Sequence, residues 1–186
     1  MDTVEPEKVG FSSERLGRIN AVMQRYIDAG KYVGILTMVA RRGRIAHLDC
    51  FGLMDAEASK PMQPDAIFRI YSMSKPITSV AAMMLYEEGQ FQLDTPVSEF
   101  IPGFKDTQVF VQETESGMEL ADLEREMTIH HLLTHTSGLS YGFHEDTPVD
   151  ALYREARQEL GGGGALERVV ETLSTLPLAF QPGQGW

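Results

Sequence analysis

A serine and a lysine three residues apart, Ser72 and Lys75, are the residues of this sequence best suited to catalysis. Together with the two residues between them they form the S-x-x-K pattern of serine enzymes that transfer acyl groups. A serine hydroxyl is a weak nucleophile until a neighbouring base takes its proton, and a lysine amine can be that base. A helix-capping serine followed by a solvated lysine gives the same pattern, so the surrounding residues must decide between the two interpretations.

Pro76 limits where the helix that carries this pair can begin. A proline has no N–H, and its ring clashes with the carbonyl four residues earlier, so the helix should start no earlier than about Ser72. At a helix N-terminus, unpaired N–H groups and the positive end of the dipole can stabilise a developing oxyanion. Lys75 then lies on the same helical face as Ser72. The sequence therefore predicts a nucleophile and a base at the start of one helix.

A second candidate nucleophile, Ser140, lies in a Gly-Leu-Ser-Tyr-Gly segment at residues 138–142. This segment fits the G-x-S-x-G turn of α/β-hydrolases, which requires a strand to run into the serine. The preceding run, residues 128–136, has helical spacing instead, and His144 is the only later histidine. We therefore interpret residues 138–142 as a glycine-rich loop.

Three histidines close together, His130, His131 and His135, raise the question of a metal site. His131 and His135 share a helical face, but Leu132 stands where the zinc-protease signature has a glutamate. We expect hydrogen-bonded or core histidines here, and no metal.

The elements that must position these residues can be read from apolar spacing and from glycine and proline stops. The sequence predicts four helices, over residues 16–27, 74–88, 149–160 and 165–176, and two strands, over 32–40 and 45–51. It also predicts short helical units over 94–103 and 128–134 and an irregular stretch over 104–126. A run of four glycines, residues 161–164, separates the last two helices. A helix, a hairpin and then further helices indicate an α+β protein rather than alternating βαβ units.

The composition is that of one soluble domain and excludes some partners. The chain has 186 residues, 42% of them hydrophobic, and a formal net charge of −11 from 16 basic and 27 acidic residues. Such a charge repels nucleic acid and anionic membrane surfaces. Cys50 is the single cysteine, so no intrachain disulfide can form. The start lacks the pattern of a signal peptide, and no run of about 18 apolar residues could span a membrane, so we expect a cytoplasmic protein.

Three blocks of sequence, in the same order, resemble the class C β-lactamase-like and penicillin-binding-protein-like serine hydrolases. They are residues 68–79, which contain the S-x-x-K pattern, residues 89–97 and residues 131–139. Within that family the chain is most similar to the family VIII carboxylesterases, and the third block is also similar to a fungal acyltransferase of statin synthesis. The resemblance extends from about residue 8 to the end of the sequence.

This resemblance implies a β-lactamase/transpeptidase-like fold in two parts. Residues 1–65 would supply a helix and a β-hairpin to an antiparallel sheet flanked by helices, and residues 66–186 a mostly helical region that begins with the S-x-x-K helix. It also implies that Ser72 is the acylated nucleophile, that its backbone N–H forms half of the oxyanion hole, and that Lys75 assists proton transfer. Tyr141 would line the substrate pocket.

Family members carry a second catalytic motif that begins with a tyrosine and follows a Pro-Gly-x-Gly-Trp segment. Residues 182–186 resemble that segment, so the resemblance implies that the tyrosine, the third motif and the strands that complete the sheet lie beyond Trp186. We expect the chain alone to be catalytically incomplete and to need a complementary carboxy-terminal polypeptide.

The expected activity is hydrolysis of small carboxylic esters with short acyl chains, through an acyl-serine intermediate and without a metal or organic cofactor. A β-lactamase, a D-amino-acid peptidase or an acyltransferase would use the same nucleophile, and fold alone does not separate them. A binding module without turnover is an alternative of another class.

Overall fold

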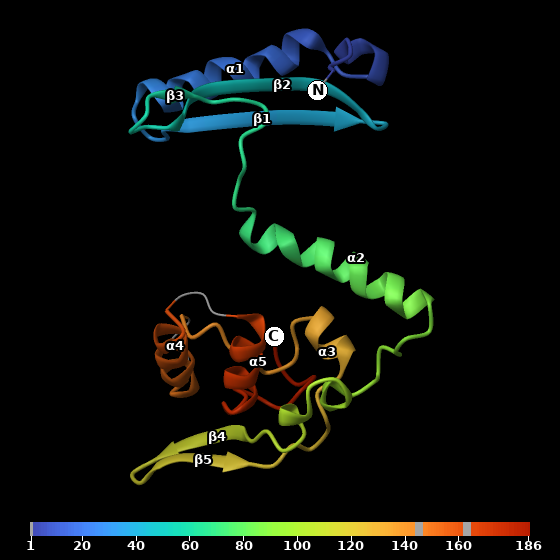
Figure 1. Ribbon diagram of the computed structural model, residues 1–186, viewed down its shortest axis with the longest axis vertical. Coiled ribbons are helices and arrows are strands. Elements are labelled where there is room, and N and C mark those ends of the chain that lie inside the picture. Colours follow the sequence, from blue (N-terminus) through green and yellow to red (C-terminus); the bar gives the residue numbers. More distant parts are fainter. Residues whose placement is uncertain (1, 144–146, 162–164) are drawn as a thin grey trace. The chain divides into compact units, whose positions relative to one another are not determined.

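The computed structural model describes residues 2–143, 147–161 and 165–186. The chain divides into two compact units, Met1–Tyr71 and Ser72–Trp186, each with its own helices and its own small sheet (Figure 1). His144 and the glycines at 162–164 lie outside the described residues.

The first unit is a helix on a three-stranded antiparallel sheet in the order β1-β2-β3. Its elements are η1 (Pro6–Val9), α1 (Ser13–Asp28), β1 (Gly34–Arg41), β2 (Arg44–Asp55) and β3 (Lys60–Pro61). Ser12 caps α1, because its side chain accepts a hydrogen bond from the backbone N–H of Arg15. Arg42 and Gly43, with φ of 54° and 71°, make the two-residue turn between β1 and β2. The predicted helix and hairpin are confirmed.

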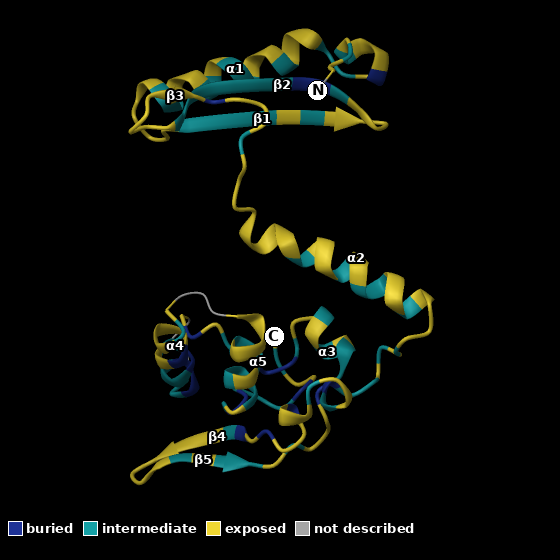
Figure 2. Ribbon diagram, in the orientation of Figure 1, coloured by how far each residue is buried: buried dark blue, intermediate teal, exposed yellow. Residues whose placement is uncertain are grey.

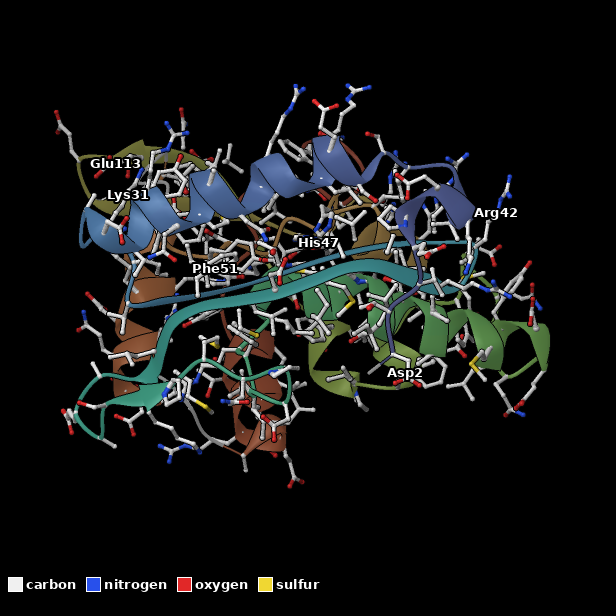
Figure 3. The ribbon with its side chains drawn as sticks, turned by 90° about the horizontal axis from the view of Figure 1, so that it is seen from above. Asp2, Lys31, Arg42, His47, Phe51 and Glu113 are labelled. Carbon is white, nitrogen blue, oxygen red and sulfur yellow. The ribbon has the colours of Figure 1, made fainter. Side chains whose placement is uncertain are left out.

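A polar network connects α1 to this sheet around His47, which is 8% exposed and lies on β2 (Figure 3). His47 Nε2 lies 2.8 Å from Thr37 Oγ1, and Nδ1 lies 3.3 Å from Asp49 Oδ2. Asn20 of α1 donates a hydrogen bond of 2.8 Å to the same Asp49 oxygen. Hydroxyl, imidazole and carboxylate follow the order of a catalytic triad. The burial of His47 and the bond from α1 indicate that the network holds the helix on the sheet.

The second unit contains most of the helices. Its elements are η2 (Tyr71–Met73), α2 (Ser74–Glu87), η3 (Val97–Glu99), η4 (Pro102–Phe104), β4 (Val109–Thr114), β5 (Gly117–Ala121), α3 (Ile129–Leu133), α4 (Val149–Glu159) and α5 (Leu166–Ser174). The helices predicted at α2, α3, α4 and α5 are confirmed. The short helix predicted over residues 94–103 consists of two 3₁₀ turns, η3 and η4.

The core of this unit brings together residues far apart in the sequence. Val97, Phe104, Val109, Met127 and Leu178 pack against one another and are all buried. Leu178 also pairs with the start of β4: its N–H donates to the Gln108 carbonyl at 2.8 Å, and its carbonyl accepts from the Phe110 N–H at 2.9 Å. The segment after α5 is therefore part of the sheet edge and of the core.

The prediction of an irregular stretch over residues 104–126 is wrong, because β4 and β5 form an antiparallel hairpin there. Val109 faces Ala121 and Phe110 faces Leu120 across this pair. Valine and phenylalanine favour strands, and Gly117, with φ of 126°, takes a backbone conformation that suits the turn. The charged residues of the two strands, Glu113 and Glu119, are both exposed.

Helix α2 is apolar in sequence and yet has no buried residue. Ile77, Val80 and Met84 share one face of the helix and are 63%, 62% and 58% exposed. Figure 2 shows exposed residues along most of its length. Among the described residues, no helix combines the length and the apolar character that crossing a membrane requires.

Candidate active site

The predicted nucleophile and base lie in contact. Ser72 is in the turn η2, directly before α2, and Lys75 is the second residue of that helix. Lys75 Nζ donates a hydrogen bond of 3.0 Å to Ser72 Oγ. Ser72 is exposed and Lys75 is half-buried, so a substrate can reach the hydroxyl from solvent while the amine stays beside it. In its neutral form the amine can accept the hydroxyl proton across the same contact.

The backbone immediately before the nucleophile is strained. Tyr71 has φ of 45°, in the left-handed region that residues other than glycine rarely adopt. Strained residues often occur beside reactive groups, where the surrounding structure fixes an unusual backbone direction. Here the left-handed residue is the first residue of η2 and directly precedes Ser72.

The third predicted residue, Tyr141, lies beside the same pair. Lys75 Nζ is 5.4 Å from the centre of the Tyr141 ring, within the range of a cation–π interaction. The Tyr141 ring is also 5.2 Å from that of Phe143, and Tyr141 is 52% exposed. The structure thus brings together all three residues that the sequence singled out: a hydroxyl, an amine in contact with it, and an aromatic face beside the amine.

The loop on either side of Tyr141 is bound to α4 by two residues that the sequence reasoning missed. Ser140 Oγ donates to Asp150 Oδ1, and Arg154 Nη1 donates to the Gly142 carbonyl at 2.6 Å. Asp150 is only 4% exposed. A sequence signal did exist, because Asp150 lies on the same face of α4 as the buried Tyr153, where a carboxylate needs a hydrogen-bond donor.

These contacts explain Ser140 without a catalytic role. Its hydroxyl also accepts from the Gly142 N–H at 2.9 Å, and helix α3, not a strand, precedes the segment. The structure agrees with the interpretation of residues 138–142 as a loop.

One of the three histidines, His131, stabilises the start of α3. His131 Nδ1 accepts a hydrogen bond of 3.1 Å from the Thr128 N–H, and the Thr128 hydroxyl accepts one from the His131 N–H, a reciprocal capping box. Burial lowers the pKa of His131, and the neighbouring His130 and Arg125 lower it further. Within the described part of the chain, no three His, Cys, Asp or Glu residues are grouped to hold a metal ion.

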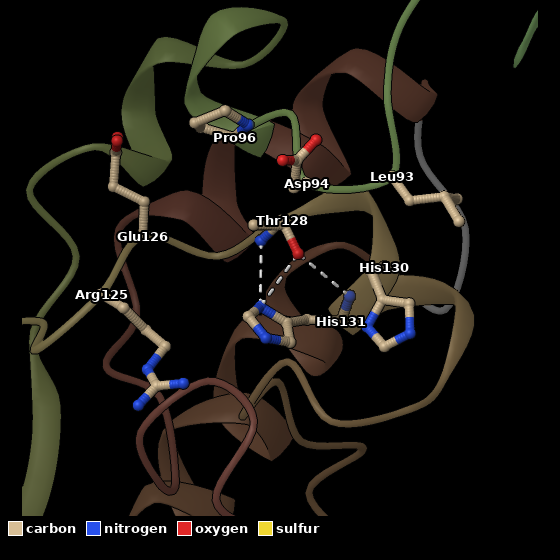
Figure 4. A pocket seen from close by; sticks show the side chains of 8 residues that line it. All are labelled: Leu93, Asp94, Pro96, Arg125, Glu126, Thr128, His130 and His131. Atoms are coloured by element: carbon tan, nitrogen blue, oxygen red, sulfur yellow. Dashed lines mark hydrogen bonds between the residues drawn. The ribbon is translucent and has the colours of Figure 1, made fainter.

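Beside this cap lies an open pocket of about 540 Å³ (Figure 4). Its lining includes His130, His131 and Arg125 together with the carboxylates of Asp94 and Glu126. Ser72, Lys75 and Tyr141 are not part of this lining. The mixed charges and the structural use of His131 give it no evident catalytic role.

This chain is similar to several known proteins. The beta-lactamase family matches residues 19–186. "Esterase EstB" of Burkholderia gladioli is 37% identical over 172 residues, which cover 91% of this chain and 41% of that esterase. The solved structure of EstCE1, described as a hydrolase with promiscuous acyltransferase activity, is 30% identical with a TM-score of 0.71 and matches 92% of this chain and 42% of its own.

A penicillin-binding protein homologue from Pyrococcus abyssi shares the fold at 24% identity, with a TM-score of 0.64 over 92% of this chain and 35% of its own. The β-lactamase/transpeptidase-like fold implied by the three sequence blocks is confirmed. The chain spans about two fifths of the length of the esterases that it matches.

Proposed function

The chain belongs to the beta-lactamase family, and from that premise we propose that it carries the nucleophile of a serine hydrolase acting on carboxylic esters. The observation that carries the proposal is the 3.0 Å contact between Lys75 Nζ and Ser72 Oγ at the start of α2. The similarity of the chain to "Esterase EstB" and to the hydrolase EstCE1, each over about nine tenths of this chain, favours an ester as the acyl donor.

In the proposed reaction the Lys75 amine takes the hydroxyl proton while Ser72 Oγ bonds to the ester carbonyl carbon. The Ser72 backbone N–H supplies one donor to the oxyanion, which collapses as the alcohol leaves with a proton. Water then attacks the acyl-serine, releasing the carboxylic acid and restoring the hydroxyl. Tyr141 lines the space beside Lys75, and a short acyl chain is the proposed substrate.

Acyl transfer is the second candidate, because EstCE1 is described as having promiscuous acyltransferase activity. An alcohol would then replace water as the acceptor of the acyl group. After turnover has been restored by the complementary polypeptide proposed below, adding increasing amounts of a primary alcohol distinguishes the two: a transferase yields mostly the new ester, whereas a hydrolase yields mostly the acid.

We also propose that turnover needs a complementary polypeptide equivalent to the part of the esterases that this chain does not match. Two observations support this. The chain covers 41% of "Esterase EstB", and α2, which carries Lys75, leaves the face formed by Ile77, Val80 and Met84 exposed. Covering such a face is worth roughly 25 cal/mol per Å² of apolar surface.

A fluorophosphonate ester tests the nucleophile, since it reports the first step and needs no attack by water. We expect one phosphonyl group per chain, located on Ser72 by peptide mapping, and none on the Ser72→Ala variant. Ser140→Ala should still be labelled at Ser72. Labelling that survives Ser72→Ala and is lost with Ser140→Ala would reverse the assignment, and no labelling after complementation would favour a binding module.

A further inference from the structure

We propose that Asp150 and Arg154 are positioning residues that hold Tyr141 against Lys75. The inference rests on the proposed function, in which Lys75 activates Ser72, and extends it to two residues of α4 that do not touch the nucleophile. Together with Ser140 and Gly142 they form what we term the α4 clamp.

Asp150 forms the first half of the clamp. One of its oxygens accepts from Ser140 Oγ, and the other accepts from the Thr147 N–H at 3.1 Å and from the Thr147 hydroxyl at 3.4 Å. A carboxylate only 4% exposed is costly to bury unless donors surround it. The donors fix the direction of the carboxylate, and the carboxylate fixes Ser140, the residue before Tyr141.

Arg154, one helical turn further along α4, forms the second half. Its guanidinium donates to the carbonyl of Gly142, the residue after Tyr141, and the Gly142 N–H donates back to Ser140 Oγ. Gly142 has φ of 77°, and a Cβ added there would lie 2.9 Å from the Arg154 nitrogen and the Asp150 oxygen of the backbone. The loop therefore lies directly on the helix, with no space for a side chain.

Tyr141 itself is poorly packed, which is why the clamp matters. More than half of its surface is exposed, and in the described part of the chain its ring lies beside the Phe143 ring and the Lys75 amine. Because more than half of Tyr141 is exposed, its position depends strongly on the backbone that is fixed at residues 140 and 142. Release of the clamp should let the ring move away from Lys75, so that the positive charge formed when the amine takes the Ser72 proton loses its contact with the ring. The reaction of Ser72 should then slow by about 2- to 30-fold, the range of a cation–π contact.

A double-mutant cycle tests this with fluorophosphonate labelling of the full chain. Asp150→Asn and Tyr141→Ala should each slow the labelling of Ser72, but Asp150→Asn should have no further effect in the Tyr141→Ala background. Arg154→Gln should behave as Asp150→Asn does. Glu155→Gln and Arg157→Gln, which change exposed charges on the same helix, are matched controls and should leave the rate unchanged. Additive losses would overturn the inference.

A second measurement, a ¹⁹F resonance of Tyr141, does not depend on the reactivity of Ser72. It can therefore still be read in variants whose labelling is too slow to measure. With 3-fluorotyrosine at position 141, the ¹⁹F resonance should shift upon Lys75→Met in the otherwise unchanged chain, and should not shift in the Asp150→Asn background. A shift that persists without Asp150 would contradict the clamp. If Ser72 is never labelled, the proposed function fails, and this resonance alone decides whether the α4 clamp positions Tyr141.

Discussion

At the scale of single residues, the proposed chemistry depends on the Lys75 amine and the Ser72 hydroxyl, which belong to residues three positions apart in the sequence. The turn η2 and the first turn of α2 place Lys75 Nζ 3.0 Å from Ser72 Oγ, so the two groups meet without any help from distant segments. This proximity is local, which is why the spacing in the sequence was enough to predict it.

Lys75→Met removes the proposed base and keeps a side chain of similar length. We expect the rate of phosphonate labelling at Ser72 to fall by about 10²- to 10⁴-fold, the usual contribution of a positioned base. The measurement is the second-order rate constant at fixed pH. Lys105→Met, an exposed lysine at the end of η4, is the control and should react at the unchanged rate. Equal rates for the two variants would remove Lys75 from the mechanism.

The contact between Asp150 and Ser140 could not be predicted in the same way. The two residues belong to different elements, and the intervening segment gives no periodic pattern from which to infer that they meet. An acidic residue near a helix start is usually assigned to solvent and to the helix dipole. The place of Asp150 one turn before Tyr153 indicates a buried carboxylate, but only the packing of the loop on α4 shows that Ser140 is its donor.

At the scale of elements, α3 is a short helix whose start depends on the ionisation of a histidine. Neutral His131 Nδ1 accepts the Thr128 N–H bond, and a protonated imidazole cannot accept it. The unfolded chain takes up a proton at His131 near its ordinary pKa of 6.5, whereas the folded chain, with its lowered pKa, does so only at lower pH. Stability from this group is therefore complete above pH 6.5 and is lost as the pH falls toward the lowered pKa.

His131→Gln should reduce this pH dependence, because a glutamine at the same position can complete a capping box without titrating. Between pH 7 and pH 5 we expect the melting temperature of the unchanged chain to fall by about 4 °C more than that of the variant, as the loss of a cap worth roughly 1 kcal/mol would produce. His130→Gln is the control and should retain most of the dependence. Parallel curves for His131→Gln and the unchanged chain would exclude this role.

The elements that the sequence predicted correctly have local signals at their ends. Ser12, Thr128 and the Arg42-Gly43 turn mark the ends of elements through their own backbone and side-chain bonds, and the structure confirms them. The hairpin β4–β5 was missed because alternation there is weak and the stretch is rich in charge. Its first residue, Val109, is buried by Leu178, a neighbour almost seventy positions away.

At the scale of the whole molecule, the proposal of a complementary polypeptide can be tested on the exposed face of α2 formed by Ile77, Val80 and Met84. Val80→Glu should change the free energy of unfolding of the chain alone by no more than about 0.5 kcal/mol, because Val80 is 62% exposed. The same change should abolish ester hydrolysis restored by a polypeptide equivalent to the unmatched part of "Esterase EstB". Hydrolysis after mixing is the measurement.

Gln90→Glu adds the same charge at an exposed position beyond the carboxyl end of α2, far along the chain from Lys75, and should leave that restored activity intact. Full turnover by the 186-residue chain without any addition would contradict the need for a second polypeptide. It would leave the assignment of Ser72 and Lys75 untouched.

The pairing of Leu178 with the start of β4 also has a consequence for the order of folding. The hairpin of the first unit closes through a two-residue turn, so its contacts are available as soon as residue 55 has been made. The second core lacks one of its five members until residue 178 has been added. During synthesis the first unit should therefore acquire protection from a protease early, while residues 97–127, which hold the other four members of the second core, remain cleavable until Leu178 has been added.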